Sequence, residues 1–134
     1  MAEELQLEVA TPERMLVREK VDEVQVPGKN GYMGILPGHA PLLSQLGIGF
    51  LSYTIAGKKR FLSIHGGFVE VLPDHVRVLA ELAEKAEEID VERAKRALQR
   101  AQEEMVNPAL GVDPAVALEA MARAQARIAA AEQK

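Results

Sequence analysis

The sequence contains no cysteine and only three histidines, at positions 39, 65 and 75. Without cysteine, the chain can form no disulfide, no thiolate metal site and no cysteine nucleophile. The histidines lie on separate segments, and no carboxylate cluster joins them. We therefore expect no metal site.

A basic surface is also missing, because 20 acidic residues outnumber 16 basic ones and give a net charge of -4. Nucleic-acid binding depends on a basic face, so we expect no nucleic-acid partner. The acidic start, Met1-Ala2-Glu3-Glu4, does not resemble a signal peptide. No apolar run approaches the roughly 20 residues that span a bilayer, so we expect membrane association only through another protein.

Signatures of catalysis are absent as well. Ser44, Ser52 and Ser63 lie outside any nucleophile elbow, and the chain has no Gly-x-x-x-x-Gly-Lys phosphate loop. No close pair of carboxylates occurs in the first part of the chain. We therefore predict that the chain is not an enzyme and has no catalytic residue.

Charge is missing from a long internal segment, although 27% of all residues are charged. Residues 30–57 contain no Asp, Glu, Lys or Arg, and their prolines and glycines exclude a helix. Such a segment either lies in a core or is covered by a partner. Its Pro-Gly-His-Ala-Pro sequence at residues 37–41 predicts an exposed turn.

Composition changes sharply near residue 79. All five aromatic residues and nine of the ten glycines come before this point, whereas sixteen of the twenty alanines follow it. The first part alternates apolar and polar residues, as at Leu5, Leu7 and Val9, and turn residues divide it into short strands. We predict an α+β chain with a β-sandwich or flattened barrel over residues 1–84 and a helical domain over residues 85–134.

Two helices are predicted in the tail. Asp90 and Asp113 are good N-caps, and Pro114 stands at the first position of the second helix. The apolar stripes are expected at Val91, Ala94, Leu98, Ala101 and Met105, and at Ala117, Leu118, Met121, Ala124 and Ile128. Alanine-rich stripes bury little area, so an antiparallel hairpin on a charged linker at residues 81–88 could dock or extend, which suggests regulation.

Four segments resemble the epsilon subunit of bacterial and chloroplast F-type ATP synthases. They are Val-Ala-Thr-Pro-Glu at residues 9–13, Gly-Ile-Leu-Pro-Gly-His-Ala-Pro-Leu at 34–42, Gly-Gly-Phe-Val-Glu-Val at 66–71 and Ile-Asp-Val-Glu-Arg-Ala at 89–94. The resemblance covers essentially the whole chain. It implies a β-sandwich of about ten strands, followed by a two-helix antiparallel C-terminal hairpin.

The resemblance also implies a function and partners. It describes a non-catalytic central-stalk subunit that links the gamma subunit to the c ring and couples proton flow to ATP synthesis. When extended, the tail would contact the alpha/beta catalytic head and restrain ATP hydrolysis. The expected location is the cytoplasmic side of a bacterial membrane, with the stromal side of the chloroplast thylakoid as the alternative.

Two loops are candidate partner contacts by resemblance. The turn of residues 37–41 would face gamma, and the turn of residues 29–31 would lie near the c ring. The individual residues are Lys29, Asn30, Gly31, Pro37, Gly38, His39, Ala40 and Pro41. The alternative from the residues alone is that both are ordinary structural turns.

No cofactor is expected to be required, but the resemblance suggests a regulatory ATP site in the folded hairpin. The residues implied are Glu84, Asp90, Arg93, Ala94, Arg100, Arg123 and Arg127. Arginine forks match phosphate oxygens well. The alternative is that these arginines are solvated and paired with Glu92, Glu103, Glu104 and Glu119. A rival function is a free-standing sensor whose hairpin closes over a nucleotide.

Overall fold

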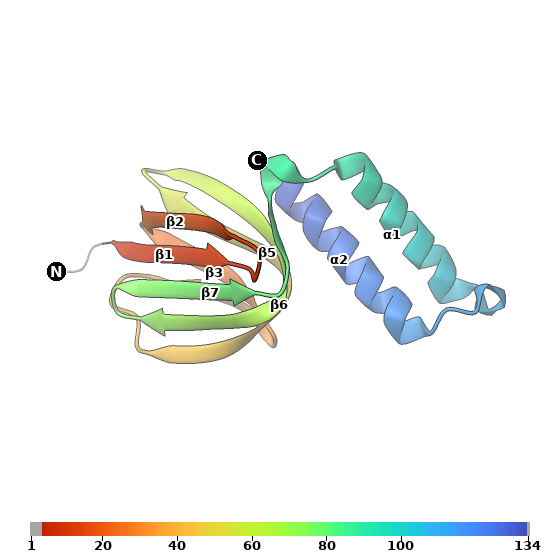
Figure 1. Ribbon diagram of the computed structural model, residues 1–134, viewed down its shortest axis with the longest axis horizontal. Helices are drawn as coiled ribbons and strands as arrows, with labels where there is room; N and C mark the ends of the chain where they lie inside the picture. Colours follow the sequence, from red (N-terminus) through yellow and green to blue (C-terminus); the bar gives the residue numbers. More distant parts are fainter. Residues whose placement is uncertain (1–3, 134) are drawn as a thin grey trace.

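The computed structural model describes residues 4–133 as a β-sandwich joined to a two-helix hairpin (Figure 1). The strands are β1 Leu5–Ala10, β2 Met15–Val21, β3 Glu23–Gly28, β4 Gly31–Ile35, β5 Leu42–Ile55, β6 Lys58–Leu72, β7 His75–Ala80 and β8 Ala83–Lys85. The helices are η1 Ala86–Glu88, α1 Val91–Val106, η2 Pro108–Leu110 and α2 Pro114–Glu132. The predicted fold class is confirmed.

The strands follow the order β2-β1-β7-β6-β5-β3-β4, and β8 pairs with β6. All pairings are antiparallel except that of β1 with β7. The long strands β5 and β6 curve, so that the sheet wraps around and its two ends face each other across a core (Figure 1). The alternation predicted for β1 is confirmed, since Leu5, Leu7 and Val9 are fully buried.

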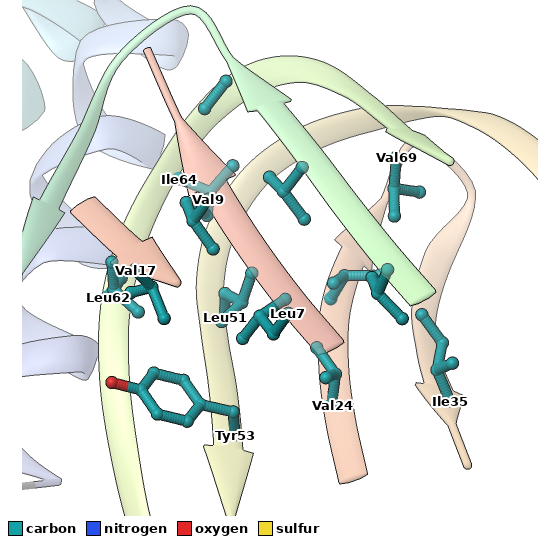
Figure 2. Close-up of a cluster of buried hydrophobic side chains, with 14 of the residues drawn as sticks. Leu7, Val9, Val17, Val24, Ile35, Leu51, Tyr53, Leu62, Ile64 and Val69 are labelled. Atoms are coloured by element: carbon teal, nitrogen blue, oxygen red, sulfur yellow. The ribbon is translucent and has the colours of Figure 1, made fainter. Parts of the chain in front are cut away.

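Large aliphatic side chains fill the sandwich (Figure 2). Leu7 and Val9 from β1 meet Leu51 from β5 and Ile64 from β6, and all four are fully buried. Burying each such side chain contributes roughly 1.5–3 kcal/mol. The sandwich therefore has a core that does not depend on the hairpin for most of its apolar burial.

Eight strands are present among the described residues, where the resemblance implied about ten. The difference arises because β5 and β6 run without a break through their glycines. Gly66 and Gly67 are among the turn residues that were expected to divide the first part of the chain into short strands. They do not end a strand but adopt φ angles of 76° and 124° within β6. A Cβ atom on Gly67 would lie 2.1 Å from the Leu79 carbonyl oxygen, so this close approach requires glycine.

The helices form an antiparallel hairpin in which α2 lies between the sandwich and α1 (Figure 1). Asp90 and Asp113 cap the two helices through side-chain bonds to the amides of Arg93 and Ala115, as predicted. Alanines make the contacts, because their small side chains let the helix axes come close together. The buried ones are Ala94 and Ala101 in α1, and Ala117, Ala124, Ala126, Ala130 and Ala131 in α2.

The stripe predicted for α2 is wrong at Leu118, a residue that is 57% exposed. The helix is covered on two sides, by α1 and by the sheet, so its buried positions do not form one stripe. Ala130 and Ala131 pack with Ile89 against Phe50 and Phe61 of the sandwich. The hairpin is thus in its docked position.

The predicted charged linker is largely ordered. Residues 83–85 form β8 on the edge of β6, and residues 86–88 form a 3₁₀ turn. Only Ile89 and Asp90 separate this turn from α1. Any hinge between sandwich and hairpin is therefore confined to a short stretch around these two residues.

Candidate functional site

A cavity of about 300 Å³ lies where the end of the sandwich meets both helices. It is lined by Glu84, Glu88, Asp90, Arg93, Ala94, Ala97 and Arg127. Five of the seven residues that the resemblance assigned to a nucleotide site are in this set. They come from β8, from the start of α1 and from the C-terminal half of α2, so only the docked hairpin brings them together.

Asp90 and Arg93 are held by the start of α1. The Asp90 carboxylate accepts a bond from the Arg93 amide at 3.1 Å and so caps the helix. This leaves negative charge at the helix N-terminus, where a phosphate would otherwise bind. An anion in the cavity is therefore directed toward the side of α1, where Arg93 lies. Arg93 makes no ion pair with any residue between 4 and 133, so its guanidinium is available to the anion.

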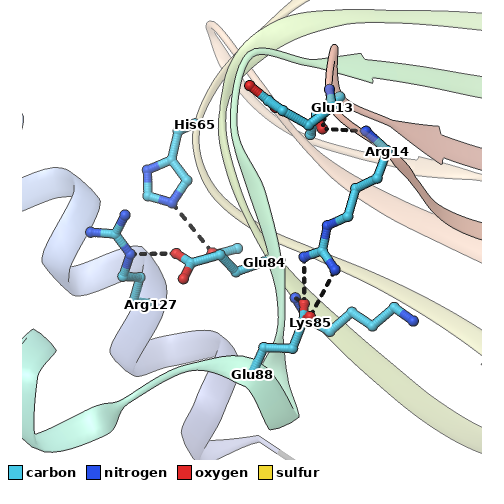
Figure 3. Close-up of polar contacts among 9 residues, drawn as sticks. Glu13, Arg14, His65, Glu84, Lys85, Glu88 and Arg127 are labelled. Carbon is cyan, nitrogen blue, oxygen red and sulfur yellow. Dashed lines mark hydrogen bonds and ion pairs between the residues drawn. The ribbon is translucent and has the colours of Figure 1, made fainter.

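Glu84 and Arg127 join the sandwich to α2 (Figure 3). Arg127 Nε donates to Glu84 Oε1 at 2.5 Å, and the two side chains are 28% and 29% exposed. Charge-assisted bonds of this length are among the stronger polar contacts in proteins. The pair therefore fastens the docked hairpin, and a bound anion would compete with Glu84 for Arg127.

Glu88 has a partner that the sequence did not suggest. Nη1 and Nη2 of Arg14 donate to its carboxylate, at 2.8 and 2.7 Å, and the Lys85 amide donates at 3.0 Å (Figure 3). These bonds, that of Arg14 first, lower the pKa of Glu88 to about 2. The same pairing raises the pKa of Arg14. Because 74 residues separate Arg14 from Glu88, no local sequence signal could have found this pair.

Arg100 and Arg123 do not line the cavity. Arg100 is 82% exposed, with its Nε 3.8 Å from a Glu104 oxygen, and Arg123 donates to Glu119 at 2.9 Å. Each is an i,i+4 pair within its own helix, Arg100 in α1 and Arg123 in α2. This agrees with the alternative of solvated surface arginines for these two positions. The cavity thus offers two guanidinium groups, from Arg93 and Arg127, rather than four.

The chemistry of the cavity is mixed, since two arginines face three carboxylates. Glu88 is already neutralised by Arg14, and Asp90 is engaged in capping. The remaining groups can bind an anion at the arginines and accept hydrogen bonds from hydroxyl or amino groups at the carboxylates. Its volume lies at the small end of the range for ligand pockets, which is roughly 300–1,000 Å³.

The turn of residues 29–31 connects β3 to β4 and is exposed. The Lys29 amide and side chain both bond to Gln45, at 3.1 and 3.3 Å, and Gly31 has a φ of 136°. A cavity of about 610 Å³ opens beside this turn, with Tyr32, Leu43 and Phe68 in its wall. The turn is therefore placed next to apolar surface.

The turn of residues 37–41 links β4 to β5 and lies partly exposed, as its sequence predicted. The Gly38 amide donates to the Pro73 carbonyl at 2.7 Å, which fixes the turn to the loop before β7. His39 Nδ1 donates to the neighbouring Ala40 carbonyl at 2.7 Å. The His39 ring is thus held locally and leaves Nε2 available to a partner.

Apolar side chains stand exposed on the outer face of the sheet near both turns. Phe68 lies opposite Leu79 on β7 and opposite Gln45 on β5, and Leu43 is the next outward residue along β5. Leu43, Phe68 and Leu79 are 72%, 50% and 54% exposed. We call these three residues the apolar strip. Contiguous exposed apolar side chains are typical of surfaces that bind a partner.

Within residues 4–133, no group of three or more His, Asp or Glu side chains is placed to hold a metal ion. In the same range, no helix is long and apolar enough to cross a membrane.

Comparisons with known proteins agree with this architecture. Residues 4–86 match the family described as ATP synthase, Delta/Epsilon chain, beta-sandwich domain, and residues 87–133 match the corresponding long alpha-helix domain. The chain is 66% identical to the ATP synthase epsilon chain of Solibacter usitatus over the full length of both. It is 46% identical to that of Syntrophobacter fumaroxidans over 98% of both.

A solved structure is also similar. It is a chain in the cryo-EM structure of the Euglena gracilis mitochondrial ATP synthase OSCP/F1/c-ring, with a TM-score of 0.78 and 28% identity. The match covers 98% of the present chain and 82% of that chain. Because sequence and fold agree along its whole length, the chain belongs to the family of ATP synthase epsilon chains.

Proposed function

We propose that the chain is a non-catalytic subunit of the central stalk of an F-type ATP synthase. The observation that carries this proposal is the similarity, over 98% of the chain, to a subunit in an OSCP/F1/c-ring structure. The charge-free segment supports it, because residues 30–57 supply Tyr32 and Leu43 to the exposed apolar surface. A central stalk needs such a surface to hold its neighbouring subunits.

In this proposal the sandwich binds gamma and the c ring, and so couples proton flow to ATP synthesis. Contacts with gamma would involve the apolar strip and the turn with Pro37, Gly38, His39, Ala40 and Pro41. Those with the c ring would involve the turn with Lys29, Asn30 and Gly31. The chain would associate with a membrane only through the complex, on the cytoplasmic side in a bacterium or the stromal side in a chloroplast.

A co-purification experiment tests the binding of gamma. Phe68→Asp places a carboxylate within the apolar strip and should reduce recovery of the chain with gamma by at least tenfold. Leu118→Asp changes a residue of similar exposure on α2 and should leave recovery unchanged. Equal recovery of both variants would contradict the proposed contact. Replacing His39 with Asp tests the neighbouring turn in the same assay.

We further propose that residues 85–134 act as a movable domain that restrains ATP hydrolysis when it leaves residues 1–84 and extends to the alpha/beta head. The support is the nature of the docking contact. On the hairpin side, the small apolar cluster against Phe50 and Phe61 has only Ile89, Ala130 and Ala131 as its buried members, and the Glu84–Arg127 pair joins α2 to the sandwich. At about 1.5 Å per residue, two helices of 16 and 19 residues could together reach on the order of 50 Å. Truncation after Glu88 should spare assembly and raise hydrolysis by the complex.

Nucleotide binding by the docked hairpin is the second proposal. The specific observation is that Glu84, Asp90, Arg93, Ala94 and Arg127 converge on one cavity. Binding of ATP would then favour the docked state, because the extended hairpin separates these residues. The alternative of a free-standing sensor predicts the same binding, but no co-purification with gamma.

Isothermal titration with ATP tests this proposal on the isolated chain. Arg93→Ala should reduce the affinity at least tenfold, since it removes an unpaired cation from the cavity wall. Arg100→Ala is the matched control, because Arg100 lies on the same helix but outside the cavity. No heat at millimolar ATP, or an equal loss in both variants, would contradict binding at this place.

A further inference from the structure

His65 is buried beneath the docked hairpin. The residue belongs to β6 and is 5% exposed, and its ring lies beside the Glu84–Arg127 pair (Figure 3). Ring atom Nε2 is 3.3 Å from the Ser63 hydroxyl oxygen. The other ring nitrogen, Nδ1, is buried without a hydrogen-bond partner within the described part of the chain. The ring therefore has no acceptor for the second proton that a charged imidazole carries.

The charges around His65 come from three neighbouring elements. Arg123 and Arg127 face it from α2, and Glu84 faces it from β8. On β5 the residue opposite is the apolar Ile48, and the Glu81 side chain lies against the next residue, Gly66. Burial, and after it the charge of Arg127, lowers the pKa of His65 to about 4, although Glu84 acts in the opposite direction.

The docked hairpin creates this environment. Both arginines belong to α2, and α2 packs against β6, the strand that carries His65. When α2 leaves the sheet, the ring is exposed to water, and the two arginines move away with the helix. The affinity of His65 for a proton must then return toward that of an ordinary histidine.

We infer that His65 is a proton-sensitive latch between sandwich and hairpin, and that protonation of its ring favours release of α2 from the sheet. This inference rests on the proposed detachment of the hairpin and adds the signal that controls it. Mild acidification would shift the chain toward the detached state, which is the state proposed to restrain hydrolysis.

The direction of the pH effect follows from the pKa of His65 in the docked and detached states. In the docked state the pKa of His65 is about 4, which lies below the ordinary value of 6.5. Docking is therefore at full strength above pH 6.5 and weakens as the pH falls from 6.5 toward 4. Over this range the docking equilibrium constant decreases about tenfold per pH unit, and it should be about 30-fold lower at pH 5 than at pH 8.

The first test is a proton NMR titration of the full-length chain carrying His39→Gln and His75→Gln. His65 is then the only histidine, so its ring signal is assigned without ambiguity. We expect a titration midpoint below pH 5, while the signals of the sandwich core report that the chain stays folded. A midpoint near 6.5 would overturn the inference, because the ring would then be insensitive to docking.

The second test measures docking itself. The chain has no native cysteine, so Lys59→Cys and Val116→Cys can carry a donor and an acceptor dye on exposed positions of the sandwich and of α2. The urea concentration is chosen so that the hairpin is detached in about half of the molecules at pH 8, and the pH is then lowered to 5. We expect energy transfer to fall in the parent and to stay constant after His65→Gln.

Equal pH profiles with and without His65 would overturn the latch. His75→Gln is the matched control, since His75 is bonded to Glu8 on the far strands and should leave the profile of the parent unchanged. Hydrolysis is not measured in either test, so failure of the latch is distinguishable from failure of the proposed restraint. A complex that hydrolyses ATP equally with and without the hairpin would overturn only the restraint.

Discussion

The sandwich and the hairpin bury different kinds of side chain. The sandwich core consists mainly of Leu, Ile and Val residues from seven strands, many of them fully buried. The hairpin buries mostly alanines, together with Ile89, and the Glu84–Arg127 pair joins it to the sandwich. Large aliphatic residues stabilise a unit strongly, whereas methyl-sized contacts stabilise one weakly. This difference supports the proposal that the hairpin can detach while the sandwich stays folded.

The largest effect is expected in the sandwich. Leu7→Ala removes most of a fully buried side chain at the centre of the core and should lower the free energy of unfolding by about 3 kcal/mol. Ala101→Gly in α1, also fully buried, should lower it by only about 1 kcal/mol, because it removes a methyl group and helix propensity. Urea denaturation followed by circular dichroism measures both. Equal effects would contradict the difference between the two units.

An intermediate effect is expected at the Glu84–Arg127 pair. Arg127→Ala leaves the Glu84 carboxylate half-buried without its partner and should weaken docking by about 1–2 kcal/mol. Arg123→Ala, one turn earlier, removes only an exposed i,i+4 pair and should change docking by less than about 0.5 kcal/mol. Energy transfer between sandwich and α2 in a urea series measures the difference. Similar changes in the two variants would show that the pair does not fasten the hairpin.

The smallest effect is the acid dependence carried by Glu88. Its pKa is lowered from 4.5 to about 2 in the folded chain, so the stabilisation is present above pH 4.5 and is lost as the pH falls toward 2. The pair is exposed at the surface, so the loss should stay below about 1 kcal/mol. Between pH 7 and pH 3, the urea midpoint should fall further in the parent than in the Arg14→Ala variant. An equal loss would remove Arg14 as the cause.

Much of the fold was predictable from local sequence. Asp90, Asp113 and Pro114 mark helix starts by chemistry that acts within one turn, and the alternation of β1 follows from the two-residue period of a strand. The strand count was less accurate, because Gly66 and Gly67 allow β6 to continue where a break was expected. A glycine pair permits both outcomes, and the packing of neighbouring strands decides between them.

The docked position of the hairpin was not predictable from sequence. Ala130 and Ala131 pack against Phe50 and Phe61 of the sheet, but alanine occurs on buried and exposed helix faces alike, so it carries no clear signal. The cavity was predicted only in part for a related reason. Glu84, Asp90 and Arg93 lie close along the chain, whereas Arg14 and His65 join the region through tertiary contacts across many residues.

Native-state hydrogen exchange tests the distinction between the two units most directly. If the hairpin opens separately, amides in α1 and α2 should exchange with opening free energies at least about 2 kcal/mol below those of β1, β5 and β6. These two groups should also respond differently to urea, with the larger dependence in the sandwich. A single opening free energy shared by helices and strands would show one cooperative unit and would contradict the account of a detachable hairpin.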